Sequence, residues 1–591
     1  MQLNSNNIKI NNMARNVAEQ LVALLVKAGI KRIYSVTGDS LNEFNNAVRK
    51  DGNIQWIHVR HEEAGAFAAA ADAELTGLAC CAGSSGPGHV HLVNGLYDAH
   101  RSGVSVLAIV ATCATGEFGT GYFQETSTTK LFDDCSHYNQ IANTPHQLPR
   151  MAQAAIQHAI QKKGVAVLGL PGDVAGLEAV ASVSSDRNYF AKAHILPAEE
   201  DLRRLADLIN RHKKICIFCG IGAADAHDEV VQLSTLLQAP VGYSFRGKMS
   251  IQPDNPNEVG MSGLLGLPAA YHSMHESDLI LLLGTDFPYA PFIPNDKTIV
   301  QIDIQPERLG RRAKVDLGLF GDIKDTIAAL LPILYKKTDG SFLQAQLQVY
   351  EKVKEHLKIY VRDKGKRDAI HPEAVASIVD RLASNDAVFT VDTGMCCVWG
   401  ARYITANGKR KLIGSFIHGS MANAMPQAIG AAMALPDRQI VALCGDGGIS
   451  MLLGDLATIK QYNLDVKIIV FNNRSLGMVK LEMEVAGILD YQTDMVNPDF
   501  SLVAKAAGIR GINIHEPEQL EPLLAEAFAN RGPVLINVFT DPNALAMPPK
   551  LDFRMIRGMS LFMGKMMLGG KFEEVIEMIK ANYKHLEDLN N

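Results

Sequence analysis

The chain has 591 residues, of which 47% are hydrophobic and 20% are charged, a composition that excludes a largely disordered protein. This length exceeds a single hydrophobic core and predicts about three domains. The net charge of −6 argues against a nucleic-acid partner attracted by an overall positive field. The 49 glycines follow no repeat, which favours tight strand-to-helix turns that approach phosphate groups.

The compartment is predicted from hydrophobic stretches and cysteines. The longest apolar stretches, such as residues 104–111, are about half the length that a bilayer crossing needs, and the polar start MQLNSNNIKINN has no apolar signal core. The nine cysteines include adjacent pairs, a poor spacing for disulfides, so we expect a cytoplasmic protein. Cys216 and Cys219 form a CxxC pattern inside a predicted buried strand, which favours two core thiols on opposite faces.

Three blocks of alternating strands and helices follow one another along the chain, and a tail ends it. Segments such as VSVLAIVA, LILLLG and VKIIVFNN predict apolar strands between helical stretches. This alternation predicts an α/β fold with doubly wound parallel sheets, in which ligands bind at the carboxyl ends of strands. The expected domains span residues 12–183, 195–335 and 368–545, and the tail spans residues 546–591.

The most specific motif is in the third block. Gly445-Asp446-Gly447-Gly448 follows the predicted strand IVALC, and Asn472-Asn473 follows the predicted strand KIIVF. A carboxylate and an amide oxygen at neighbouring strand ends can share one Mg²⁺, while glycines let the backbone close on a diphosphate. The pair of motifs is far more specific than an isolated GDG turn and predicts a Mg²⁺-diphosphate site.

These motifs, together with VTGDSLN, RHEEAGAFAAAADAELTG, GSSGPG, GYFQET and GSFIHGSMANAMPQAIGA, resemble the thiamine-diphosphate enzymes over nearly the whole chain. The resemblance is strongest to the pyruvate oxidase group, and within it to the quinone-dependent pyruvate dehydrogenases. It implies a pyrimidine-binding domain, a central FAD domain and a diphosphate- and Mg²⁺-binding domain, in that order. It also implies that Asp446, Asn473 and the carbonyl of Ser475 hold Mg²⁺. The residues that it implies for thiamine diphosphate are Gly419, Ser420, Met421, Asp446, Gly447, Gly448, Asn473, Leu476, Gly477 and Met478, with Met421 as the wedge that bends the cofactor.

The first block is expected to supply an acid that activates the thiamine ring. The cofactor needs a desolvated carboxylate at its pyrimidine nitrogen N1′. The family motif assigns this role to Glu62, with the neighbouring Glu63 as the alternative, because a Glu that opens a helix is often a first-turn residue.

Contacts to the substrate are implied at two places. Phe123 and Gln124 match a loop that overhangs the cofactor in this group, where a Phe can cap a methyl ketone and a Gln can bind a carboxylate. Val479 and Glu482 match residues that face the thiazolium ring. An exposed Glu after a turn is otherwise a common surface residue, so Glu482 stays open between the two interpretations.

The middle block carries a weaker pattern. Gly220 and Gly222 follow a strand, but the third glycine of a dinucleotide motif is missing, so spacing alone leaves nucleotide binding open. The resemblance favours FAD binding. The residues that it implies are Gly220, Gly222, Arg246, Ser262, Gly263, Leu264, Leu265, Thr285, Asp286, Phe287, Pro288, Tyr289, Asp303 and Asp322. Met478 is a departure, since relatives often have an aromatic residue facing the flavin there.

The implied reaction is oxidative decarboxylation of pyruvate to acetate and CO2, with electrons passing through FAD to a membrane quinone. The alternatives are an oxygen- and phosphate-dependent pyruvate oxidase that makes acetyl phosphate and H2O2, and an acetolactate synthase-like carboligase. A non-catalytic regulatory subunit is a further alternative, which the presence of Glu62 and both cofactor motifs disfavours. Because the family pairs the activating Glu with a Mg²⁺ site across two chains, we expect at least a dimer, and a tetramer is usual for the group.

A quinone lies in the membrane, so a quinone-reducing enzyme needs a segment that contacts the membrane, and the tail is the candidate. Phe572, Val575, Ile576, Ile579, Tyr583 and Leu586 follow helical spacing. Residues 571–591 hold three Lys and five acids, whereas residues 546–570 hold four bases and one acid and could attract anionic lipid. The expectation is either peripheral binding on the inner face of the cell membrane or packing over the chain's own active site.

Overall fold

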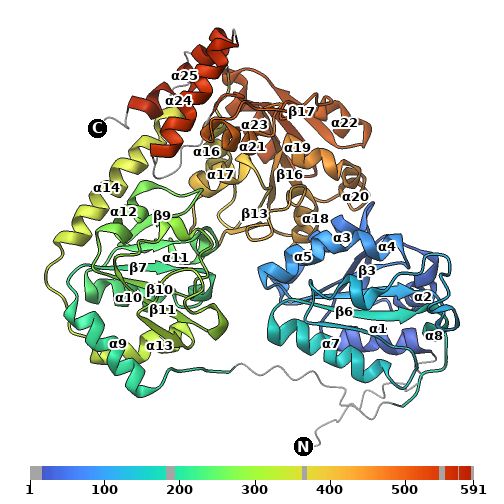
Figure 1. Cartoon of the computed structure of the whole chain (residues 1–591). Helices are drawn as coiled ribbons and strands as arrows, with labels where there is room; N and C mark the ends of the chain where they lie inside the picture. The colour runs from blue at the N-terminus through green and yellow to red at the C-terminus, as the bar shows by residue number, and fades with distance from the viewer. Residues whose placement is uncertain (1–15, 182–192, 363–368, 545–552, 570, 588–591) are drawn as a thin grey trace, which may run out of the picture. The chain divides into compact units, whose positions relative to one another are not determined.

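The computed structural model describes residues 16–181, 193–362, 369–544, 553–569 and 571–587 (Figure 1). Residues 182–192, which include most of the segment between the first two expected domains, and residues 546–552 at the start of the expected tail lie outside these described residues. The chain divides into two compact units. The first contains Met1–Ala191, Ile417–Leu435 and Ala457–Tyr462, and the second contains Lys192–Phe416, Pro436–Leu456 and Asn463–Asn591.

Three six-stranded sheets form the framework, and all of their paired strands are parallel, which confirms the predicted α/β class. Parallel sheets are covered on both faces, so their strands are continuous apolar runs. Every residue of β4 (Val106–Thr112) and of β16 (Val466–Asn472) is buried. The apolar segments in the sequence therefore predicted these strands correctly.

The first unit contains the sheet of order β2-β1-β3-β4-β6-β5. Its other strands are β1 (Arg32–Ser35), β2 (Gln55–His58), β3 (Ala79–Gly83), β5 (Tyr138–Ile141) and β6 (Val165–Pro171). Its helices are α1 (Val17–Lys27), α2 (Asn42–Asp51), α3 (Glu62–Thr76), α4 (Pro87–His91), α5 (Val93–Ser102), α6 (Thr128–Leu131), α7 (Leu148–Lys162) and α8 (Gly172–Ala175). Helix α18 (Ala424–Ala434), from much later in the chain, packs on α3 in the same unit, and the main chain of Ala68 leaves no room for a side chain at Gly430.

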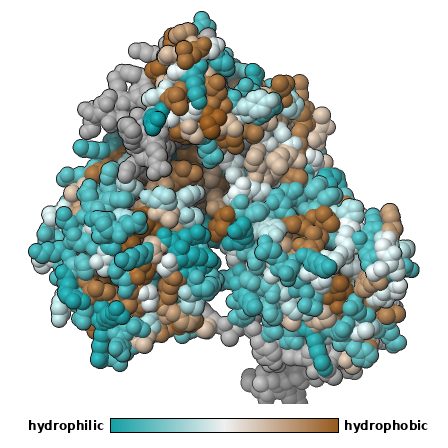
Figure 2. Space-filling view, in the orientation of Figure 1, coloured by the Kyte–Doolittle hydropathy of each residue, from teal (hydrophilic) through white to brown (hydrophobic). Residues whose placement is uncertain are grey.

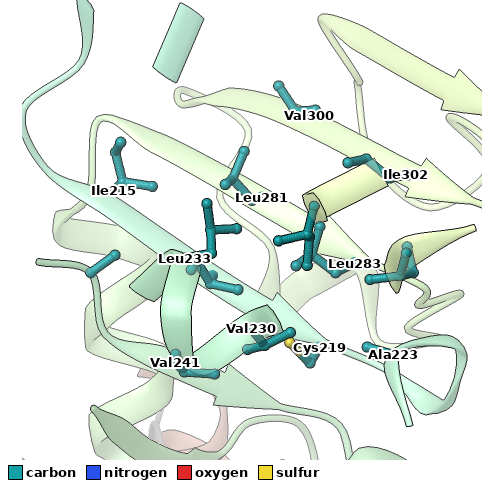
Figure 3. Packing of buried hydrophobic residues seen from close by; sticks show 14 of the residues in the cluster. Ile215, Cys219, Ala223, Val230, Leu233, Val241, Leu281, Leu283, Val300 and Ile302 are labelled. Carbon is teal, nitrogen blue, oxygen red and sulfur yellow. The ribbon is translucent and has the colours of Figure 1, made fainter. Parts of the chain in front are cut away.

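The second unit begins with the sheet of order β12-β11-β10-β7-β8-β9. Its strands are β7 (Ile215–Cys219), β8 (Val241–Tyr243), β9 (Glu258–Met261), β10 (Leu279–Leu283), β11 (Thr298–Asp303) and β12 (Leu317–Phe320). Its helices are α9 (Glu199–Arg211), α10 (His227–Leu237), α11 (Lys248–Ile251), α12 (Pro268–Glu276), α13 (Ile323–Leu330), α14 (Ser341–Leu357) and α15 (Ile359–Arg362). Figure 3 shows side chains of β7, β8, β10 and β11 packed with Val230 and Leu233 of α10.

The third sheet, of order β14-β13-β15-β16-β18-β17, also belongs to the second unit. Its other strands are β13 (Val388–Val391), β14 (Lys411–Gly414), β15 (Ile440–Gly445), β17 (Arg510–Ile514) and β18 (Val534–Phe539). The helices around it are α16 (Pro372–Leu382), α17 (Met395–Tyr403), α19 (Asp446–Met451), α21 (Gly477–Val485), α22 (Phe500–Ala506) and α23 (Pro517–Ala529), and the tail forms α24 (Phe553–Leu568) and α25 (Phe572–Glu587). All of α20 (Leu456–Gln461) except Leu456 belongs to the first unit.

All nine cysteines are buried and unpaired. Cys216 and Cys219 of β7 belong to different hydrophobic clusters, so they point to opposite faces of the sheet, as the strand period predicts. Burial raises the pKa of Cys81 and of Cys397 to about 12. Among the described residues, no helix combines the length and the hydropathy that crossing a bilayer requires.

Candidate active site

Glu62 opens helix α3 in the first unit, directly after the N-cap residue His61. Its side chain is buried, and its Oε2 lies 2.9 Å from Nδ1 of His91. Burial of a carboxylate beside few hydrogen-bond donors is the environment that thiamine activation requires.

Glu63 has different partners. Its Oε1 accepts a hydrogen bond of 2.7 Å from Asn94 Nδ2, which also donates to Ser420 Oγ at 2.9 Å. Nε2 of His418 lies 2.9 Å from Oδ1 of the same Asn94. Glu63 is therefore engaged in fixing the segment that precedes α18, whereas Glu62 is not.

The segment Gly419-Ser420-Met421 precedes α18 and belongs to the first unit. Gly419 has φ +74 with open space around it, which explains a glycine at this turn. Met421 is half-buried.

Two residues anchor the loop that contains Phe123 and Gln124: Ser85, just before α4, and His89, within α4. Ser85 Oγ donates to the Gln124 carbonyl at 3.0 Å, and Nε2 of His89 contacts Thr126 Oγ1. Burial lowers the pKa of His89 to about 4, so this ring is neutral at pH 7. Phe123 itself is 77% exposed, which leaves an apolar side chain at the tip of an anchored loop.

The third sheet brings the predicted Mg²⁺ ligands together in the second unit. Asp446 follows β15 and Asn473 follows β16, and these strands pair along their length. Asp446 Oδ2 accepts from the main-chain nitrogen of Arg474 at 2.7 Å, and Asn473 Oδ1 accepts from that of Ser475 at 3.1 Å. The Ser475 hydroxyl is buried and has no hydrogen-bond partner among the described residues. The carboxylate of Asp446 and the amide oxygen of Asn473, at neighbouring strand ends, fit a hard cation such as Mg²⁺, for which the Ser475 carbonyl is the third expected ligand.

Asn497 is a site residue that the sequence did not reveal. Its Nδ2 donates to Asp446 Oδ2 at 2.8 Å and to Asn472 Oδ1 at 3.0 Å. Burial raises the pKa of Asp446, while the bond from Asn497 lowers it and favours the ionised form. No short-range pattern links residue 497 to a strand end, so only the folded chain shows it.

Asp392 is a second such residue, and it follows β13 at the point where the strand order reverses. A Cβ at Gly448 would overlap its carboxylate, and Gly447 donates its main-chain N–H to Asp446 Oδ1 at 2.9 Å. The glycines of the motif therefore serve close packing of the acid-bearing strand ends. Asp392 ends a predicted strand, and this position was the available signal.

Helix α21 begins right after the Asn473 loop. It contains Gly477, Met478, Val479 and Glu482, and its N-cap residue is Leu476. Gly477 lies against the side chains of Asn473 and Met395, Met478 packs on the core of the third domain, and Val479 and Glu482 are exposed.

Leu265, from a segment expected to bind FAD, packs on the same hydrophobic core as Met478 of α21. Arg402 of α17 donates to the carbonyls of Leu265 and Gly266, each at 3.2 Å. Tyr289 is 37% exposed, and its ring centroid lies 5.5 Å from that of Phe287. Within the second unit, the expected FAD segment and the helix that follows the expected Mg²⁺ loop therefore pack on one core.

The other expected FAD residues gather at the carboxyl end of the central sheet. Gly220 and Gly222 pack against the main chain of Gly284, where a Cβ on either would collide. The Ser262 hydroxyl is buried without a partner among the described residues. Asp303 ends β11, and burial raises its pKa. An unpaired hydroxyl and a buried acid beside glycine turns fit a dinucleotide.

The remaining residues of this set differ in environment. Phe287 is buried against Phe218, with ring centroids 5.1 Å apart, so its side chain belongs to the core. Asp286 pairs with Arg311 and Arg312, and Asp322 caps α13 by accepting from the Asp325 N–H at 3.2 Å. Gly263 and Thr285 are buried, Arg246 and Leu265 are half-buried, and Leu264 and Pro288 are exposed.

The described part of the tail packs on α21. Gly558 of α24 lies against the Val485 carbonyl, and Lys565 Nζ donates to the Gly487 carbonyl at 2.8 Å. Helix α25 buries Val575 and Met578 with α24, but Phe572, Ile576 and Ile579 stay 57%, 49% and 39% exposed. Figure 2 shows hydrophobic surface at the top of the view, where α24 and α25 lie. The side chains of Tyr583 and Leu586 lie outside the described residues.

Comparison with known proteins agrees with this geometry. Residues 15–131 match the N-terminal TPP binding domain of thiamine pyrophosphate enzymes, residues 202–330 the central domain, and residues 392–538 the C-terminal TPP binding domain. The chain belongs to the thiamine pyrophosphate enzyme family.

Three relatives span most of the chain. YdaP of Bacillus subtilis, which is named as a thiamine pyrophosphate-containing protein, is 34% identical over 94% of this chain and 96% of its own. A pyruvate oxidase of Lactiplantibacillus plantarum is 32% identical over 88% of this chain and 87% of its own. The acetolactate synthase large subunit of Parasynechococcus marenigrum is 30% identical over 88% of this chain and 87% of its own.

Proposed function

We propose that this enzyme converts pyruvate, water and a quinone to acetate, CO2 and a quinol. The observation that carries the redox part is that Leu265, from an expected FAD segment, packs on the same hydrophobic core as Met478 of α21 and accepts a hydrogen bond of 3.2 Å from Arg402 of α17, which supports a flavin beside the thiamine site. The pyruvate oxidase relative supports the substrate. Thiamine diphosphate supplies the electron sink for loss of CO2, and FAD accepts the two electrons.

The proposed roles of the chain's own residues follow from their environments. Glu62 bonds the pyrimidine nitrogen of thiamine, and Asp446, Asn473 and the Ser475 carbonyl hold Mg²⁺. Phe123 caps the methyl group of pyruvate, and Gln124 donates to its carboxylate. A Phe at the tip of an anchored loop suits a small methyl ketone, since apolar area covers the methyl group and keeps water away.

The proposed electron acceptor and membrane association rest on the tail. Helix α25 exposes Phe572, Ile576 and Ile579 along one face. Each apolar side chain that enters a lipid phase contributes about 1.5–3 kcal/mol when fully buried, so partial insertion of three suffices for reversible binding. The enzyme would then bind its quinone at the membrane surface.

An anaerobic assay tests the proposal. We expect pyruvate to bleach the flavin absorbance and to reduce an added quinone, faster with anionic vesicles than without them. Flavin that stays oxidised would contradict the redox function and favour the carboligase that the acetolactate synthase relative suggests. Rapid flavin reoxidation by O2, with acetyl phosphate formed only when phosphate is present, would instead establish the oxygen-dependent oxidase.

The tail is tested separately with Phe572→Ser/Ile576→Ser/Ile579→Ser. We expect this variant to lose sedimentation with anionic vesicles while it keeps pyruvate-dependent flavin reduction. As a control, Leu502→Ser changes another exposed apolar residue, on α22, and should sediment like the wild type. Unchanged sedimentation of the triple variant would contradict membrane binding through α25.

A further inference from the structure

His91 is the hydrogen-bond partner of Glu62. It ends the short helix α4, and its Nδ1 lies 2.9 Å from Glu62 Oε2. The His91 side chain is 45% exposed, whereas that of Glu62 is 8% exposed. Because the carboxylate accepts, His91 must donate from Nδ1. A half-exposed histidine thus reaches a buried acid and fixes one of its two oxygens.

The other carboxylate oxygen is open. Glu62 Oε1 has no hydrogen-bond partner among the described residues, and it lies beside Gly88, where a Cβ would come within 3.3 Å of it. Because residue 88 is a glycine, it places no side chain of its own beside Oε1, and the atom nearest to the position of a Cβ there is Ser84 Oγ. One carboxylate oxygen is therefore held by His91, and the other has no hydrogen-bond partner among the described residues.

A metal site is the other arrangement to weigh, since ligand atoms of His61, Glu62 and His91 lie within 4.8 Å of one another. His61 Nδ1, however, accepts the main-chain N–H of Glu63 at 3.2 Å, so in the neutral ring the proton is on Nε2 and blocks that atom as a ligand. The His61 and His91 rings also stack, with centroids 4.5 Å apart and planes 26° from parallel. Stacked rings do not converge on one ion, so the cluster is better explained as a hydrogen-bonded acid.

We propose that His91 is a positioning residue for thiamine activation: it holds Glu62 through Oε2 and so keeps Oε1 directed at the pyrimidine nitrogen N1′. This inference rests on the proposed function, which assigns the activating role to Glu62. A partner that fixes the orientation of a functional group is worth about 10- to 100-fold where such partners have been measured at metal sites. Without His91, the Glu62 side chain would populate several orientations, and only some of these would place Oε1 at the pyrimidine nitrogen.

The test measures binding and avoids turnover. Cofactor-free protein is titrated with thiamine diphosphate and with its analogue that has CH in place of N1′, each with Mg²⁺, by calorimetry. The ratio of the two affinities reports the bond between Glu62 and N1′. For His91→Leu we expect this ratio of affinities to fall about 10-fold. For His91→Gln, whose amide can donate to the same oxygen, we expect the ratio to return most of the way to the wild-type value. His158→Leu, on α7 of the same unit, is the matched histidine control and should keep the wild-type ratio.

Glu62→Ala, which removes both donor and acceptor, distinguishes failure of the Glu62 assignment from failure of the His91 role. If Glu62→Ala leaves the ratio unchanged, the assignment of Glu62 itself is wrong. If Glu62→Ala lowers the ratio but His91→Leu does not, the positioning role is overturned and the activating role stands. Deuterium exchange of the C2 proton of bound thiamine, followed by quenched NMR, gives a second measure, and we expect it to slow in His91→Leu and recover in His91→Gln. Thermal unfolding of each variant identifies any loss that comes from misfolding.

Discussion

The side-chain amide of Asn497 joins Asp446 to Asn472, at 2.8 Å and 3.0 Å, and so ties together the ends of the paired strands β15 and β16. For Asn497→Ala we expect about 10- to 100-fold weaker Mg²⁺ binding in the presence of thiamine diphosphate, because the carboxylate loses the donor that orients it. Calorimetric titration with Mg²⁺ measures this. Asn530→Ala, at the end of α23, should bind Mg²⁺ like the wild type, and equal affinity of both variants would exclude the orienting role.

Two glycines of α24 give a matched pair for the contact between the tail and α21. A Cβ at Gly558 would overlap the Val485 carbonyl, whereas nothing lies within 4 Å of one at Gly564. We expect Gly558→Ala to destabilise the contact by about 1–3 kcal/mol through overpacking. Gly564→Ala should be neutral or stabilise α24 by about 0.5–1 kcal/mol through helix propensity.

Hydrogen exchange of the α24 amides, read by mass spectrometry, checks this pair. Faster exchange in Gly558→Ala alone is the expected result. Equal protection in both variants would mean that α24 does not depend on the close approach to Val485.

Glu484 of α21 predicts a pH dependence of stability. It is 1% exposed, and neither of its carboxylate oxygens has a hydrogen-bond partner among the described residues. Burial raises its pKa from 4.5 to about 7; the charge of Lys480 opposes this rise and that of Asp490 adds to it. The folded state therefore holds a proton that the unfolded state has lost between these two values. The contribution of Glu484 to stability therefore falls as pH rises from 4.5 to about 7, by about 3 kcal/mol in total.

Urea unfolding across this pH range tests the assignment. Glu484→Gln cannot ionise, so we expect it to gain about 3 kcal/mol of stability relative to the wild type as pH rises from 4.5 to about 7. Glu482→Gln, an exposed position in the same helix, is the control and should follow the wild-type pH profile. Parallel pH profiles of Glu484→Gln and the wild type would show that Glu484 is not the titrating group.

Complementation tests the proposed sharing of a site between two chains. Under the proposed function, Glu62→Gln and Asp446→Asn should each be inactive with pyruvate, because one would lack the proposed activating acid and the other a proposed Mg²⁺ ligand. When the two variants are unfolded together and refolded, we expect partial activity, since a mixed oligomer contains sites with both residues intact. Absence of activity in a mixture that light scattering shows to be oligomeric would place both residues in one chain's site.

The fold was predictable where sequence pattern and burial coincide. Continuous apolar runs identified β4 and β16, because both faces of a parallel sheet are covered. The Asp446 motif was predictable for the same reason, since it directly follows such a strand. Asn497 and His91 were not, because Asn497 lies in a loop and His91 ends a short helix, and tertiary packing sets how each approaches its partner.

The tail shows another limit of sequence pattern. Helical spacing indicated that Phe572, Val575, Ile576 and Ile579 share an apolar face, but spacing does not tell which of them a neighbouring helix covers. The structure buries Val575 together with Met578 and leaves the other three at the surface.

The nine buried cysteines have a practical consequence. Four of them lie in or beside the first sheet, two in β7 of the central sheet, and three around β13 and β15 of the third: Cys80, Cys81, Cys113 and Cys135; Cys216 and Cys219; Cys396, Cys397 and Cys444. A thiol buried in a core is protected from alkylation until its own domain opens. Pulsed alkylation during denaturation, followed by peptide mapping, would therefore record the order in which the three domains unfold, with a natural reporter in each.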